Sequence, residues 1–110
     1  MGNPITPKEN VVVSEAYRRV VRGMHCARCG KPPQSQFCHS DEGKGMGIKT
    51  DDRRGWPGCA ECHFLVGTSG TFRKAERRAL DEQYSRETRA LVLSLGIWPK
   101  SLELWVDNMP

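Results

Sequence analysis

The chain has 110 residues, of which 37% are hydrophobic, and 17 basic against 13 acidic residues give a formal net charge of +4. A single domain of this size is expected, with so small a core that a second source of stability is useful. The sequence contains no apolar run near the ~20 residues of a membrane span and no secretion signal at residues 1–10, so a cytoplasmic protein is predicted.

The first elements are a short lead-in and a helix. Residues 1–10 are polar, contain Pro4 and Pro7, and are interpreted as a flexible lead-in. Ser14 is a suitable N-cap for a helix that runs through Arg22 and ends at Gly23. Residues 25–70 hold every cysteine and histidine and lack a sustained helical period, which indicates short strands and loops.

The C-terminal third is predicted to be a helical extension over residues 71–110. Apolar residues recur at three- and four-residue steps over 72–95, which predicts a long helix. Ser69 or Thr71 is the expected N-cap, Gly96 is expected to close the helix, and a break near Tyr84 is considered. The tail at 97–110 carries two tryptophans and is expected to pack back onto the helices.

Four cysteines form two C-x-x-C pairs, Cys26 with Cys29 and Cys59 with Cys62. Two such pairs are typical of a tetrahedral structural Zn²⁺ site, and zinc binding would supply folding energy to a small core. A redox pair is disfavoured because no βαβ pattern surrounds either motif, and disulfides are disfavoured in a reducing compartment. Cys38 is interpreted as a small buried residue, with a metal-ligand role as the alternative.

Two histidines and an acidic pair lie between and beside the cysteine pairs. His39 precedes a glycine-rich stretch, His63 directly follows Cys62, and Asp51 and Asp52 lie between them. Together they offer a general base and ligands for a second ion.

An ordered motif carries a family resemblance. The chain reads H-S-x from His39, then G-K-G-x-G-x-K-x-x-D over residues 43–52, then C-x-x-C-H over 59–63. Residues 25–67 thereby resemble the small phage and prophage HNH endonucleases. The resemblance implies an α+β chain with a ββα-metal core, in which a β-hairpin and a helix are pinned by the four-cysteine zinc. The N-terminal helix and the long C-terminal helix flank this core within one domain, 1–110.

The resemblance also implies residue roles and a reaction. His39 corresponds to the general base, and His63 to a ligand of the catalytic ion. Asp52 takes the place of the usual asparagine, where it binds the ion directly or fixes the loop that orients His39. The expected activity is metal-dependent hydrolysis or nicking of DNA by a phage-encoded enzyme. Mg²⁺ suits carboxylate and water ligands, whereas imidazole is also compatible with Mn²⁺, Ni²⁺ or Zn²⁺.

The sequence departs from the family pattern at two positions. Cys38 stands where many members have an acidic residue before the base, and Gly67 stands where some carry a further histidine. The coordination of the catalytic ion is therefore left open.

Basic residues near the motif are candidate DNA contacts, namely Lys44, Lys49, Arg53 and Arg54. Such contacts would be mainly to the phosphate backbone and sensitive to salt. Arg73, Lys74, Arg77 and Arg78 are interpreted as a solvated helix face paired with nearby acids, with phosphate contacts as the alternative.

Two other functions remain open. A non-catalytic zinc-knuckle module that binds nucleic acid would keep the cysteines and basic residues without using His39, Asp52 or His63. An interaction protein would use the apolar tail at 98–106 for self-association.

Overall fold

The computed structural model describes residues 12–39 and 51–105. In chain order it contains α1 (Glu15–Arg22), β1 (Gln36–Cys38), the 3-10 helix η2 (Asp52–Arg54), β2 (Trp56–Gly58), α2 (Ala60–Gly67) and α3 (Lys74–Ser94). The predicted α+β class is confirmed, with three α-helices and one two-stranded sheet in these ranges. The predicted lead-in at residues 1–10 lies outside the described residues.

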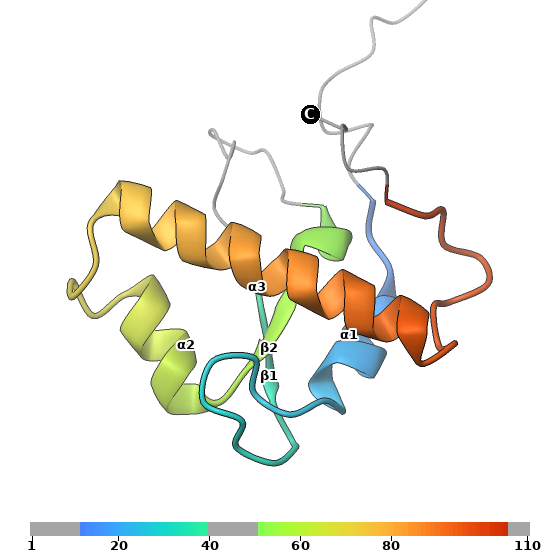
Figure 1. The fold of residues 1–110 in the computed structure, drawn as a ribbon, viewed down its shortest axis with the longest axis horizontal. Coiled ribbons are helices and arrows are strands. Elements are labelled where there is room, and N and C mark those ends of the chain that lie inside the picture. The colour runs from blue at the N-terminus through green and yellow to red at the C-terminus, as the bar shows by residue number, and fades with distance from the viewer. Residues whose placement is uncertain (1–11, 40–50, 106–110) are drawn as a thin grey trace, which may run out of the picture.

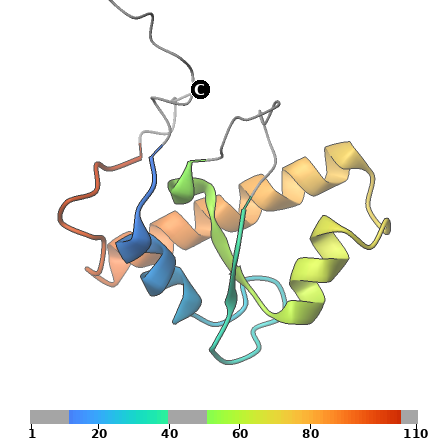
Figure 2. The ribbon, with the colours of Figure 1, turned by 180° about the vertical axis from the view of Figure 1, so that it is seen from behind.

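The two strands are short and antiparallel. Phe37 lies opposite Pro57 in the ladder, and Cys38 lies opposite Trp56. Helix α2 begins directly after β2, so the expected order of two antiparallel strands followed by a helix is present. Helix α3 crosses one face of the strands, while α1 and α2 lie on either side of them (Figures 1 and 2).

Helix α1 has the predicted ends. The Ser14 hydroxyl accepts a hydrogen bond from the Tyr17 amide at 3.1 Å, which satisfies one of the free N–H groups of the first turn. At the other end, the Gly23 amide donates to the Val20 carbonyl. The side chains of Tyr17 and Val21 are fully buried, so this short helix is held by its apolar face.

Helix α3 starts two residues later than predicted and runs without a break. Its N-cap is Arg73, whose amide donates to the Glu76 carboxylate at 2.7 Å. Ser69 and Thr71, the predicted caps, are hydrogen bonded to each other instead. Gly96 closes the helix as predicted, with a φ of +72° that glycine adopts without the strain a side chain would add.

Two apolar clusters and a cysteine cluster make up the described interior. The α1 cluster contains Tyr17, Val21, Met24, Val92 and Leu102, with Trp98 packed against it. The strand cluster contains Cys38, Trp56, Val66 and Tyr84. The expected return of the tail is confirmed for Trp98 and Leu102, whereas Leu104 stays exposed. None of the helices within the described ranges is both long and apolar enough to cross a membrane.

Candidate functional site

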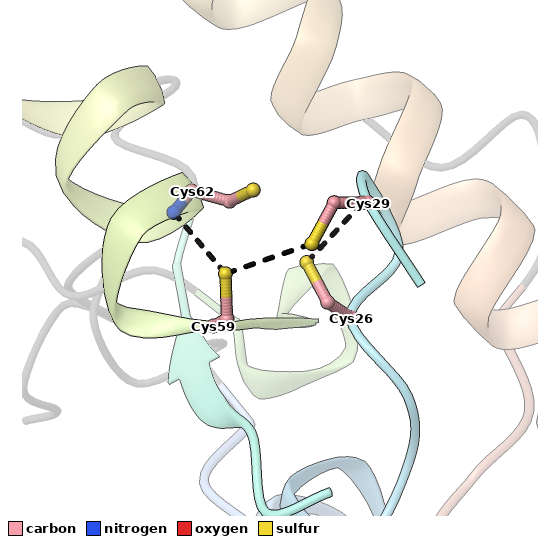
Figure 3. A group of neighbouring side chains, drawn as sticks. All are labelled: Cys26, Cys29, Cys59 and Cys62. Carbon is pink, nitrogen blue, oxygen red and sulfur yellow. Dashed lines mark hydrogen bonds between the residues drawn. The ribbon is translucent and has the colours of Figure 1, made fainter. Parts of the chain in front are cut away.

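The four cysteines of the two C-x-x-C pairs meet at one point between the N-terminal knuckle and α2 (Figure 3). Their sulfur atoms all lie within 4.8 Å of one another, and the Cys29 and Cys59 sulfurs are 3.7 Å apart. A tetrahedral Zn²⁺ with Zn–S bonds of about 2.3 Å separates its sulfurs by about 3.8 Å. The predicted cysteine cluster is thus present, and its size and donor set fit a zinc ion.

Backbone amides favour the thiolate form of Cys26, whereas burial and hydrogen bonds with the other three cysteines raise the pKa of Cys62. The Cys29 amide points at the Cys26 sulfur at 3.5 Å, and the Cys62 amide points at the Cys59 sulfur at 3.4 Å. Burial acts to raise the pKa of the Cys26 thiol, but amide hydrogen bonds outweigh it and lower this pKa to about 6. Thiolate is the form that binds zinc.

The cysteine cluster is tied to the strands and to α3. The amide of Ala27, inside the first knuckle, donates to the Pro57 carbonyl of β2 at 2.8 Å. Arg28 donates to the Tyr84 hydroxyl of α3 at 3.0 Å and lies over the Phe72 ring. A metal bound at the cysteines would therefore also hold β2 and the middle of α3 in place.

Cys38 lies outside the cysteine cluster. Its side chain is 1% exposed and packs in the strand cluster beside Trp56 and Tyr84. Burial raises the pKa of its thiol to about 12, so the sulfur stays protonated near neutral pH. The expectation of a small buried residue is confirmed.

His39 follows β1, and its imidazole is held by Asp52. The Nε2 atom of His39 is 2.9 Å from Oδ1 of Asp52. The Phe37 ring packs edge-on against the imidazole at a centroid distance of 4.8 Å. The ring is thus restrained on two sides, while its side chain keeps 31% of its surface exposed.

Asp52 is saturated with donors. Its fully buried carboxylate accepts from the Ser14 amide at 2.7 Å, from two nitrogens of Arg18, and from His39. Burial acts to raise the pKa of Asp52, but the hydrogen bonds from His39, Arg18 and Ser14 outweigh it and lower the pKa to about 2. Since four donors occupy the two oxygens, the geometry favours the second role expected for Asp52, orientation of His39, over direct ion binding.

His63 lies on α2 and is oriented by β1. Its Nδ1 atom is 2.6 Å from the side-chain oxygen of Gln36. An amide oxygen only accepts, so Nδ1 carries the proton and Nε2 keeps a lone pair. This is the arrangement in which a histidine binds a metal ion through Nε2.

The two histidines line one open groove of about 1010 Å³ between β1, α2 and the first half of α3. Phe64 and Thr68 contribute from the α2 side, and three basic residues contribute from α3: Lys74, Arg77 and Arg78. The structure therefore brings His39 and His63 to a common surface, with Asp52 buried behind His39.

Of the predicted basic contacts, the two in the described residues, Arg53 and Arg54, do not line this groove. Arg53 is 3% exposed and pairs with Asp51 through two guanidinium nitrogens, so it is not offered to a bound phosphate in this structure. Arg54 pairs with Glu82 at 3.3 Å and lies over the Trp105 ring. Lys44 and Lys49 lie outside the described residues.

Sequence reasoning missed two contributors to this site and left the role of a third open. Arg18 and Gln36 lie outside the motif, and only the fold shows that they hold Asp52 and His63. The basic residues of α3 were noted, but the period of a helix does not show which groove its charged face lines. Comparison with protein-family models, curated proteins and solved structures returned no match.

Proposed function

We propose that this chain is a metal-dependent DNA endonuclease or nickase of the HNH class. The observation that carries the proposal is the placement of a carboxylate-held His39 and a Gln36-held His63 on one groove. A further support is the order of the elements, in which His39 follows the first strand and His63 lies on the helix after the second.

In this proposal His39 is the general base. A hydrogen bond donated from Nε2 to Asp52 leaves the lone pair on Nδ1, which takes a proton from the attacking water. The Asp52 carboxylate then stabilises the imidazolium that forms. Arg18 acts as a positioning residue, because it keeps that carboxylate ionised and fixed in direction.

His63 is the side chain that would hold the catalytic ion, through Nε2. A divalent ion such as Mg²⁺ would neutralise charge on the phosphate and stabilise the leaving oxygen. Within the described ranges, the only cluster of three or more metal-ligating side chains is the four-cysteine group. Water and the phosphate itself therefore complete the coordination of the ion in this proposal.

The zinc at the four cysteines has a structural part in the proposal. It fixes α2, which carries His63, against the knuckle that bonds to β2. The second candidate function is a zinc-knuckle module that binds nucleic acid without cutting it. The observation that favours it is that both oxygens of Asp52 accept hydrogen bonds from protein groups. The described groove is therefore left with few ligands for an ion.

Plasmid cleavage separates the two functions. The zinc-loaded protein is incubated with supercoiled plasmid in Mg²⁺, Mn²⁺ or Ni²⁺, beside His39→Ala and the control His25→Ala, which changes an exposed histidine outside the groove lining. We expect wild type and His25→Ala to nick the plasmid, and His39→Ala to lose activity by at least roughly 10²-fold with its zinc content unchanged. Absence of cutting in every ion would favour the binding module, and equal cutting by His39→Ala would remove it as the base.

A further inference from the structure

Phe64 is an exposed aromatic side chain in the groove. It directly follows His63 on α2, is 61% exposed, and is the only aromatic among the large hydrophobic side chains that stay exposed in the described ranges. Phenylalanine is usually buried, because removing its large apolar ring from water is favourable in free energy. A ring left in solvent beside two histidines is available to a ligand with a flat apolar face.

The wall of the groove formed by α3 is basic. Lys74 and Arg78 are exposed, and Arg77 donates to the Gly67 carbonyl at 3.1 Å, which fixes this part of α3 to the end of α2. The acidic residue on the same wall, Asp81, accepts a hydrogen bond from the Trp56 indole at 2.9 Å and is buried. The groove therefore pairs an aromatic face with cationic groups.

We propose that the groove between α2 and α3 binds a DNA strand with unpaired bases. A base stacks on Phe64, while Lys74 and Arg78 contact the phosphates on either side of it. The proposal rests on the function proposed above, because it places the bound strand alongside His39 and His63. It adds a substrate class, which is single-stranded DNA or DNA with a single-stranded segment.

Stacking chemistry favours an unpaired strand over an intact duplex. In a duplex the base faces are covered by their neighbours, and exposing one face requires a few kcal/mol of unstacking. A single strand presents its faces freely, and proteins that bind it combine aromatic platforms with a basic groove. The groove volume of about 1010 Å³ is near the upper end of small-ligand sites, which suits a few nucleotides.

Fluorescence anisotropy of labelled DNA tests the proposal without interference from cleavage. The protein is zinc-loaded, carries His39→Ala, and is titrated onto a short mixed-sequence DNA strand or the duplex of the same sequence, without added divalent ion. Three further variants are compared in this background: Phe64→Ala, Lys74→Gln with Arg78→Gln, and the control Leu91→Ala. Leu91 is 47% exposed and lies about 15 Å along α3 from Asp81.

The single strand is expected to bind at least roughly tenfold more tightly than the duplex. Phe64→Ala is expected to weaken single-strand binding roughly tenfold, as loss of one stacked base does, with duplex binding unchanged. The Lys74 and Arg78 double variant is expected to reduce the salt dependence of single-strand binding by about 1.4 in logarithmic slope. Leu91→Ala should bind as its parent does.

Equal affinity for strand and duplex would overturn the proposal, as would unchanged single-strand binding by Phe64→Ala. Equal weakening by Leu91→Ala would also overturn it, because the effect would then come from general destabilisation. The proposed endonuclease function fails separately, if wild type binds single strands through Phe64 but cuts no DNA in any ion. Conversely, wild-type cleavage with no effect of the groove variants on binding would leave the endonuclease and remove this substrate class.

Discussion

At the C-terminal end of α3, Val92 packs against Tyr17 and Val21 of α1, and Trp98 of the tail closes the cluster. Near the start of the same helix, the partners are the strands, α2 and a knuckle whose interior is sulfur. The first end is held by apolar burial that needs no ligand. The second is held by the smaller strand cluster together with four cysteines, whose thiolates would repel one another without a bound metal ion.

This difference explains why both proposed sites lie at the second of these ends, next to the cysteine cluster. The groove with His39 and His63 is bounded by β1, α2 and the first half of α3, all of which are tied to the knuckles. Short strands and a short helix supply little apolar area for their own support. A metal ion at the four cysteines would add to the support that the strand cluster gives to this end.

Loss of a zinc ligand is expected to have the largest effect on the molecule. Cys59→Ser should abolish stoichiometric zinc binding and unfold the part of the fold around the cysteines. The reason is that structural zinc contributes about 10–16 kcal/mol, compared with a net stability of about 5–15 kcal/mol. Zinc content and circular dichroism check this. Cys38→Ala is the matched control, since it removes a buried thiol outside the cluster and should retain one zinc. A Cys59→Ser protein with full zinc and an unchanged melting temperature would contradict the assignment.

A change at Asp52 is expected to have an intermediate effect, because this residue joins α1 to the groove. Asp52→Asn removes the charge facing Arg18, and a pKa lowered from 3.8 to about 2 corresponds to about 2 kcal/mol. The carboxylate stabilises the fold fully above about pH 4, and this contribution is lost as the pH falls toward 2. The stability gap between wild type and variant should therefore be largest near neutrality and shrink on acidification.

Urea unfolding over a range of pH measures this gap. Glu61→Gln is the control, because it breaks an exposed pair with Lys31 that should contribute little. A gap that stays constant from neutral to acid pH would argue that Asp52 stabilises the fold by shape rather than by charge.

The smallest expected effect is at the apolar end. Tyr17 is fully buried, and its hydroxyl has no hydrogen-bond partner among the described residues. Tyr17→Phe keeps the packing on Trp98 and removes a desolvated polar atom, so it should stabilise the fold by about 1 kcal/mol. A raised urea midpoint with an unchanged m-value would show this. Tyr84→Phe is the counterpart, because it removes the acceptor of Arg28 and should lower the midpoint instead.

Local signals were enough to predict α1 and the cysteine cluster. The Ser14 cap and Gly23 define a helix through contacts within a few residues, and the C-x-x-C spacing predicts directly that the four sulfurs meet. The start of α3 was misplaced because Ser69 and Thr71 satisfy each other, a competition that propensity alone does not reveal. Positions outside the described residues, such as Lys44 and Lys49, stay predictions.

Long-range partners could not be predicted from the sequence. The contact between Arg18 and Asp52 joins residues far apart in the chain. Arg53 and Arg54 are adjacent, and they differ only in the direction in which η2 points their side chains. The partner of Asp52 and the directions of the two arginines both depend on how η2 packs against α1 and α3. The period of α3 predicted an apolar stripe. That its basic face lines a groove becomes apparent only when the position of α2 beside it is known.

Strand β1, which His39 follows, and strand β2 are each three residues long, and an isolated two-stranded sheet is at best marginally stable in water. In the fold both strands pack against α1 and α2, and β2 also packs against α3. During synthesis, the ribosome releases α1 and both cysteine pairs before α3, whose Val92 packs against α1. We therefore expect the two histidines to reach their final separation only after α3 has been synthesised.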